Sequence, residues 1–171
     1  LLWGAFPFAE ITNRFLQAKP SRVDVLIIAP GAFDDSGLKA VPLPGHFLDM
    51  VGILTPDDVF FVADSVFSEA LLEKYRIMFV MDVQAELETL DLLERTSAAW
   101  FVPSHADATR DIGPLAAANR RTLMMVSEAV LDCCSEPVAR DEIVKRLGQR
   151  FGLSMTISEF LLNSAAVAAH L

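Results

Sequence analysis

The sequence predicts an α/β fold, because short apolar runs of strand length alternate with longer stretches of helical periodicity. The strand-like runs are rich in β-branched, aromatic and other apolar residues, and polar turns separate them. The five runs that we expect to form strands are residues 23–29, 38–43, 50–54, 59–63 and 98–102. The chain has 171 residues, of which 53% are hydrophobic, so we expect one domain-sized core and a small appendage.

Turn residues mark the ends of the expected strands. Pro30-Gly31 follows the first strand and Pro44-Gly45 follows the second. Thr55-Pro56-Asp57-Asp58 separates the third from the fourth and predicts a hairpin of two buried strands.

Helical periodicity fills most of the remaining chain. A short pattern around Ile11 precedes Pro20, and a second begins at Phe67. Apolar residues three and four apart then predict a helix from Val83 to Leu93 and a long one over residues 111–131.

Residues 136–171 differ from the rest of the chain and predict a separate helical unit. They hold four basic and four acidic side chains, so the excess of nine negative charges lies in residues 1–135. Two helices are expected here, and the second begins at a capping box, Thr156-x-x-Glu159. The apolar pattern continues to the last residue and the chain begins with Leu1 rather than Met, so we expect a piece of a longer polypeptide.

Composition excludes several classes of protein. No stretch approaches the roughly 18 uninterrupted apolar residues of a membrane-spanning helix, and because no charged segment and small-residue cleavage site is visible at the start, we expect no signal peptide. With 14 Lys and Arg against 23 Asp and Glu, nucleic acid is not an expected partner. Adjacent Cys133 and Cys134 fit neither a disulfide framework nor a zinc knuckle, so we expect reduced thiols and a cytoplasmic protein.

Three candidate metal ligands follow expected strands. His46 comes just after one strand, His105 just after another, and Asp64 at the end of a third. Strand ends present side chains to a crevice in α/β proteins, and two imidazoles with one carboxylate suit zinc or iron. Each residue also has a simpler interpretation, because both histidines fit hydrogen-bonded turn residues and Asp64 fits the cap of the helix that follows.

Other polar residues near these positions carry weaker hypotheses. Asp49 and Asp107 lie within three residues of a candidate ligand and would orient an imidazole or be solvated turn residues. Ser104 lacks the Gly-x-Ser-x-Gly turn of an activated nucleophile. His170 is expected on the surface of the last helix.

The ordered motifs resemble the second half of a metallo-β-lactamase-fold hydrolase. They are Leu-Pro-Gly-His46, the hairpin that ends in Val-Ala-Asp64, and Val-Pro-Ser-His105. The resemblance covers roughly residues 38–134, and residues 136–171 resemble the start of a winged-helix-like appendage. It implies half of an αββα sandwich, in which helices flank a mixed sheet over residues 1–135.

The resemblance also implies a reaction and a ligand set. His46 would be a terminal ligand of one metal, Asp64 would bridge two metals, and His105 would be a terminal ligand of the second. Two zinc ions would complete such a site, with iron or manganese as alternatives, and a metal-bound hydroxide would attack a small ester, lactone or thioester.

The chain lacks the family's His-x-His-x-Asp-His motif, which belongs to the first half of the fold. We therefore expect an incomplete or empty metal site, little activity from this chain alone, and self-association through an uncovered sheet face. Two other interpretations stay open. The chain would be a non-catalytic binding module whose helical tail contacts protein or nucleic acid, or a scaffold whose site has decayed.

Overall fold

The computed structural model describes residues 22–24, 26, 27, 29–32 and 35–171. Within them, five strands form one sheet in the order β1-β2-β3-β4-β5. The pairs β1–β2, β2–β3 and β3–β4 are antiparallel, and β5 runs parallel to β4. The strands are β1 (Gly31–Ala32), β2 (Lys39–Pro42), β3 (Val51–Leu54), β4 (Val59–Phe67) and β5 (Trp100–His105). The helices are α1 (Glu69–Tyr75), α2 (Val83–Arg95), α3 (Gly113–Cys133), α4 (Arg140–Phe151) and α5 (Ile157–Ala169).

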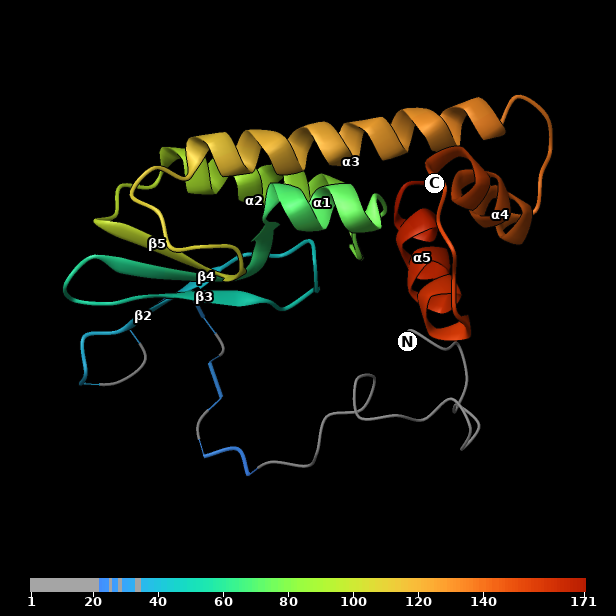
Figure 1. Cartoon of the computed structure of the whole chain (residues 1–171). Coiled ribbons are helices and arrows are strands. Elements are labelled where there is room, and N and C mark those ends of the chain that lie inside the picture. Colours follow the sequence, from blue (N-terminus) through green and yellow to red (C-terminus); the bar gives the residue numbers. More distant parts are fainter. Residues whose placement is uncertain (1–21, 25, 28, 33–34) are drawn as a thin grey trace.

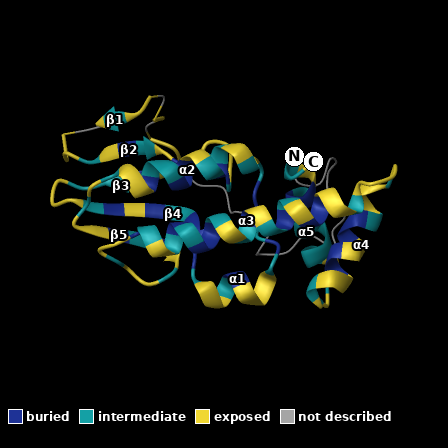
Figure 2. Ribbon diagram, turned by 90° about the horizontal axis from the view of Figure 1, so that it is seen from above, coloured by how far each residue is buried: buried dark blue, intermediate teal, exposed yellow. Residues whose placement is uncertain are grey.

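The helices α1, α2 and α3 all lie on one side of the sheet (Figure 1). The strand β4, which lies between β3 and β5, alternates, since Phe60 and Val62 are fully buried while Phe61 is exposed. The same alternation is visible as buried and exposed bands along β4 in Figure 2. Phe60 and Val62 pack with Leu90 and Leu93 of α2 in the main core. The expected α/β class, a mixed sheet flanked by helices, is confirmed.

The opposite side of the sheet carries an apolar surface that we call the open face. Ile53 pairs with Phe61 across β3 and β4, and Phe61 pairs with Val102 of β5. Directly opposed residues point to the same side of a sheet, so these three form one apolar row. Val51 and Trp100 extend it, and both are exposed. None of the helices among the described residues covers this row (Figure 1).

Two further helices gather at the far end of α3, as Figure 1 shows. A second core forms there, in which Val126 and Val130 of α3 pack with Ile143, Val144 and Leu147 of α4 and with α5. The capping box at Thr156 is present, which confirms the expected start of α5. Residues 136–171 contain no strand, so the helical appendage is found while its winged-helix likeness and its status as a separate domain remain predictions. No helix among the described residues combines the length and apolarity that crossing a membrane requires.

The prediction of a strand over residues 23–29 is wrong for the described part of that stretch, which forms none. Val23 and Leu26 are 67% and 75% exposed, so these apolar side chains lack the packing that stabilises a strand. Gly31, expected in a turn, instead begins β1 and pairs with Ala40. The helical pattern around Ile11 lies outside the described residues.

Candidate functional site

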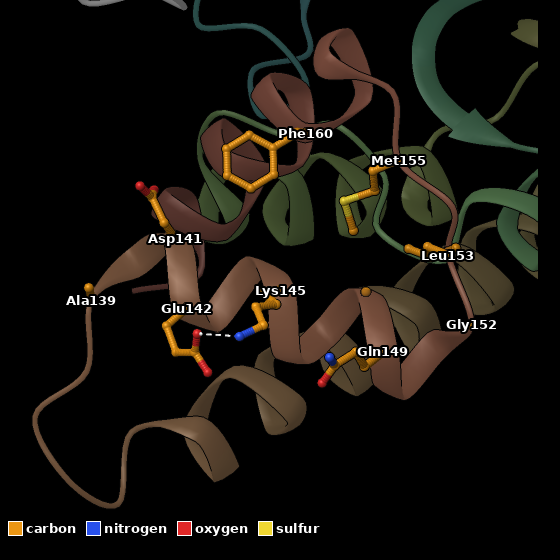
Figure 3. Close-up of a pocket in the computed structure, with 10 residues that line it drawn as sticks. Ala139, Asp141, Glu142, Lys145, Gln149, Gly152, Leu153, Met155 and Phe160 are labelled. Atoms are coloured by element: carbon orange, nitrogen blue, oxygen red, sulfur yellow. Dashed lines mark hydrogen bonds and ion pairs between the residues drawn. The ribbon is translucent and has the colours of Figure 1, made fainter.

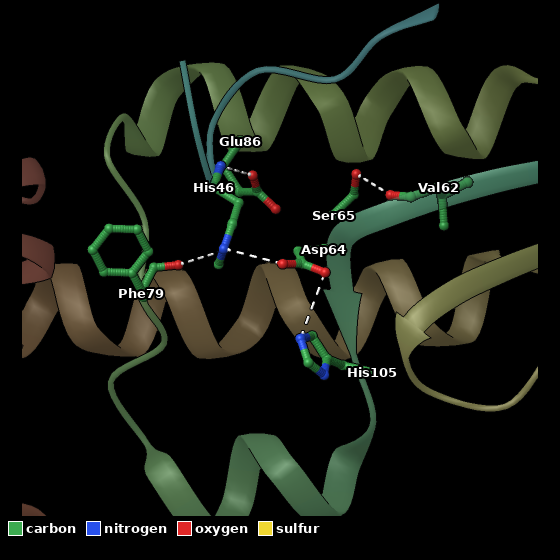
Figure 4. Close-up of polar contacts among 7 residues, drawn as sticks. All are labelled: His46, Val62, Asp64, Ser65, Phe79, Glu86 and His105. Carbon is green, nitrogen blue, oxygen red and sulfur yellow. Dashed lines mark hydrogen bonds and ion pairs between the residues drawn. The ribbon is translucent and has the colours of Figure 1, made fainter. Parts of the chain in front are cut away.

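The three candidate ligands come together in the structure (Figure 4). The Nε2 atom of His46 lies 3.4 Å from Oδ2 of Asp64, and the Nε2 atom of His105 lies 3.5 Å from Oδ1 of the same carboxylate. Each imidazole therefore faces a different oxygen of Asp64. These three residues are 18 to 59 positions apart in the sequence. They nevertheless form one cluster, as the order of motifs predicts.

Asp64 lies inside β4 rather than at its end, and a β-bulge sets its direction. Ala63 has a φ of 49°, and the pairing of β4 with β5 shifts register on both sides of it. A bulge of this kind breaks the two-residue alternation and re-aims the next side chain. The Ser65 hydroxyl donates to the Val62 carbonyl at 2.7 Å and satisfies a backbone group at the bulge. Ser68 caps α1, so the interpretation of Asp64 as a helix cap is wrong.

His46 is held by a tight turn against the segment that leads into α2. Gly45 has a φ of 136°, which only glycine adopts without strain, and its carbonyl accepts hydrogen bonds from the backbone N–H groups of Met81 and Asp82. The Nδ1–H of His46 donates to the Phe79 carbonyl at 3.0 Å. Because that bond places the proton on Nδ1, Nε2 is left with a free lone pair directed at Asp64.

Two buried residues of α2 hold the same turn, and sequence analysis missed both. The carboxyl of Glu86 accepts the backbone N–H of His46 at 2.7 Å, and the hydroxyl of Thr89 donates to the Pro44 carbonyl at 2.7 Å. Burial raises the pKa of Glu86 to about 8. The signal was a carboxylate in the apolar stripe of α2, since Glu86 is three residues after Val83 and four before Leu90.

Aromatic rings pack against both imidazoles, although the side chain of His105 remains 46% exposed. Phe67 stacks on His105, with centroids 5.2 Å apart, and also lies 5.7 Å from the His46 ring. The side-chain amide of Asn119 on α3 bonds both the N–H and the carbonyl of Phe67, which fixes that ring's backbone. Burial lowers the pKa of His46, although the Asp64 carboxylate and the Phe79 carbonyl oppose the shift.

The cluster fits a metal in its donor geometry but not in its donor number. Two ligands on one tetrahedral zinc ion are about 3.3 Å apart, given bonds of ~2.0 Å, and both distances to Asp64 are close to that value. However, each ion would have only one histidine and one carboxylate oxygen, where zinc takes three or four protein ligands. Among the described residues, no group of three or more His, Cys, Asp or Glu side chains is placed to hold one ion. These residues alone therefore do not form a complete metal centre.

The other polar candidates do not join the cluster. Asp49 and Asp107 are exposed, which agrees with their interpretation as solvated turn residues, and Ser104 is exposed as well. His170 was expected on the surface, and this is wrong. It follows α5 and is half-buried against α3, with its Nδ1 2.8 Å from the Ser127 hydroxyl. Burial lowers the pKa of His170 to about 4.

Two hollows lie outside the cluster. A cavity of about 20 Å³ lies behind the site, with Phe79, Glu86 and His170 in its wall, and has room for about one water molecule. A shallow groove of about 800 Å³ runs between α4 and α5 (Figure 3). Met155 and Phe160 line it, while Lys145 on its rim is paired with Glu142. It contains no cluster of catalytic side chains.

The fold and the cluster define a mixed sheet with helices on one face and two imidazoles sharing a carboxylate. Two solved structures have a similar fold. One is a metallo-beta-lactamase family protein from Thermus thermophilus, with a TM-score of 0.60 and 17% identity over 86% of this chain and 48% of its own. The other is a beta-lactamase domain protein from Burkholderia ambifaria, with a TM-score of 0.65 and 18% identity over 91% of this chain and 47% of its own.

These likenesses show that the chain has part of a metallo-β-lactamase fold. The chain spans about half the length of each of the two structures. No protein-family model matches the sequence, and no curated protein matches it significantly.

Proposed function

We propose that this chain is the C-terminal half of a metal-dependent hydrolase of the metallo-β-lactamase superfamily. The observation that carries the proposal is the Asp64 carboxylate, which directs one oxygen to each of two imidazoles. The partial match to structures about twice as long supports the same conclusion. A cytoplasmic location is part of this proposal, since both cysteines are free.

In the complete protein, His46 and His105 would each bind one metal and Asp64 would bridge the two. Bound metal would supply Lewis acidity, which polarises a carbonyl and lowers the pKa of water. Zinc is the metal we propose, because imidazole and carboxylate donors suit it. The remaining ligands would come from outside the described residues.

The proposed substrates are small esters, lactones or thioesters. In their hydrolysis the oxygen of water bonds to the carbonyl carbon, the C–O or C–S bond breaks, and the leaving group takes up a proton. The acidic composition of the chain, with a net charge of −9, favours these over a nucleic-acid substrate.

The first test uses metal content and histidine chemical shifts of this chain. Elemental mass spectrometry after dialysis is expected to find close to no zinc, because two donors per ion are too few. Excess zinc is still expected to shift the Nε2 signals of His46 and His105 in NMR spectra, and Asp64→Ala to abolish both shifts. Asp107→Ala is the matched control, since Asp107 is exposed and outside the cluster.

The second test is enzymatic. In a longer polypeptide that contains this sequence, Asp64→Ala is expected to abolish metal-dependent hydrolysis, while Asp107→Ala retains it. Full metal-dependent activity of the Asp64→Ala variant would refute the proposal. Zinc shifts in this chain that are unchanged by Asp64→Ala would refute the proposed ligand set.

We also propose that the open face binds a second copy of this chain. Its residues Val51, Ile53, Phe61, Trp100 and Val102 carry no charge, and the charged group that the structure places against them, the Arg110 guanidinium over the Trp100 ring, is basic. An acidic second copy therefore meets no carboxylate in this row. Sedimentation at micromolar concentration is expected to show dimers, and Phe61→Ser to give monomers. A monomeric wild-type chain would contradict this proposal, and dimers that persist in Phe61→Ser would place the interface elsewhere.

A further inference from the structure

We infer that Glu86 and Thr89 of α2 are positioning residues for the His46 imidazole. Among the described residues, neither side chain forms a hydrogen bond or ion pair with Asp64 or His105; their bonds go to His46 and Pro44. Both act on the Pro44-Gly45-His46 turn, and through it they set where the His46 ring lies.

The turn is bonded to one short segment of the chain. The Glu86 carboxyl accepts from the His46 N–H, and the Thr89 hydroxyl donates to the Pro44 carbonyl. The Gly45 carbonyl accepts from the backbone just before α2. Three consecutive residues of the turn are therefore each bonded to the first two turns of α2 or to the residues that lead into it.

The helix α2 approaches the turn closely. A Cβ atom added at Gly45 would lie 2.3 Å from Oε2 of Glu86 and 2.4 Å from its Cα. The turn is in direct contact with the helix backbone, so little movement of His46 is possible while these bonds persist.

Glu86 and Thr89 are buried polar groups at positions where apolar residues would otherwise fit. Glu86 is 5% exposed and Thr89 is 2% exposed. Burying a carboxyl or a hydroxyl costs free energy unless it forms hydrogen bonds, and the bonds that compensate this cost here go to the turn that carries His46.

The bonds to the turn complete a set that controls the whole ring. The Phe79 carbonyl fixes the tautomer of His46, and the Phe67 and Phe79 rings limit its rotation. Glu86 and Thr89 fix the backbone from which the ring projects. This inference concerns the position of His46 and holds whether or not a metal binds.

The test compares four variants of this chain by NMR. Glu86→Leu removes the acceptor, Glu86→Gln keeps a carbonyl oxygen in the same place, and Thr89→Val removes the donor at constant shape. Glu88→Leu is the control, because Glu88 is exposed on the same helix. The readouts are hydrogen exchange of the His46 amide and the ring nitrogen shifts of His46 and His105.

Glu86→Leu is expected to speed exchange of the His46 amide about tenfold, as the loss of one buried hydrogen bond implies. It is expected to shift the ring nitrogens of His46 and leave those of His105 unchanged. Glu86→Gln should restore the wild-type values, and Thr89→Val should move the His46 signals in the same direction as Glu86→Leu.

A general packing role would move the signals of His46, His105 and the core together, and that result would overturn the inference. Unchanged His46 signals in a folded Glu86→Leu variant would also overturn it. If Glu86→Leu does not fold, Thr89→Val and Glu86→Gln decide the question by the same readouts. Because no metal is added, these outcomes are independent of those that test the proposed hydrolase.

Discussion

The buried imidazole of His170 makes a specific prediction about acid stability. Its side chain joins the end of α5 to Ser127 of α3, and burial lowers its pKa from 6.5 to about 4. The fold therefore favours the neutral imidazole. Because the unfolded chain binds a proton at higher pH than the folded chain, stability is complete above pH 6.5 and is lost as the pH falls toward 4.

The size of the effect follows from the two pKa values. A shift of one pKa unit corresponds to about 1.4 kcal/mol. The shift of His170 therefore lowers the free energy of unfolding by about 3 kcal/mol once the pH is well below 4. Between about pH 8 and about pH 5, the contribution of His170 to the free energy of unfolding is expected to fall by about 2 kcal/mol.

The perturbation is His170→Asn, whose side-chain amide can replace Nδ1 toward Ser127 but does not titrate. Urea unfolding of the wild type and the variant, monitored by circular dichroism, gives the two free energies at each pH. The difference between the two proteins is the quantity to follow. Glu86 has a raised pKa and makes stability fall as the pH rises from 4.5 to about 8, but it does so equally in both proteins.

The result that refutes this reasoning is a difference between wild type and variant that stays constant from about pH 8 to about pH 5. Such a result would mean that His170 titrates normally in the folded chain. Ser127→Ala removes the hydrogen bond to His170 and keeps the imidazole that titrates. It is expected to lower the free energy of unfolding by about 1 kcal/mol at neutral pH.

Three further predictions concern stability at neutral pH and are measured by the same urea unfolding. Gly45→Ala is expected to cost about 3 kcal/mol or more, because its Cβ would overlap Glu86 and its φ of 136° strains any other residue. Phe60→Ala is expected to cost about 3–5 kcal/mol because the ring is fully buried, whereas Phe61→Ala on the open face should cost less than about 1 kcal/mol when both are measured on the monomer, at protein concentrations below those that favour the proposed dimer. Thr156→Ala removes the side-chain acceptor that forms one half of the capping box. The expected loss in the free energy of unfolding is about 1 kcal/mol.

Each of these predictions has a control within the chain. Gly31→Ala shares a positive φ with Gly45→Ala but meets no atom within 4 Å, so it measures backbone strain without overlap. Equal losses at Gly31 and Gly45 would contradict the close packing of α2. Equal losses at Phe60 and Phe61 would contradict the open face, and Ser154→Ala, at an exposed position, should be neutral where Thr156→Ala is not.

Local patterns in the sequence were sufficient for most elements of the fold. The hairpin around Thr55-Pro56-Asp57-Asp58, the helix from Val83 and the capping box at Thr156 depend on neighbouring residues, so periodicity and turn chemistry identify them. The stretch 23–29 has the composition of a strand and still forms none where it is described, because a strand also needs a partner and a packed face.

The candidate site divides in the same way. His46, Asp64 and His105 could be named from the sequence because each follows or lies in a recognisable strand, in an ordered set of motifs. The sequence did not show the bulge at Ala63, the hydrogen bond that Glu86 accepts from His46, or the contact of the Phe67 ring with both imidazoles. These features depend on contacts between residues far apart in the chain. Short-range preferences therefore indicate most of the elements and the polar residues that follow them, while only tertiary packing decides whether a strand-like stretch finds a partner and in which direction each side chain points.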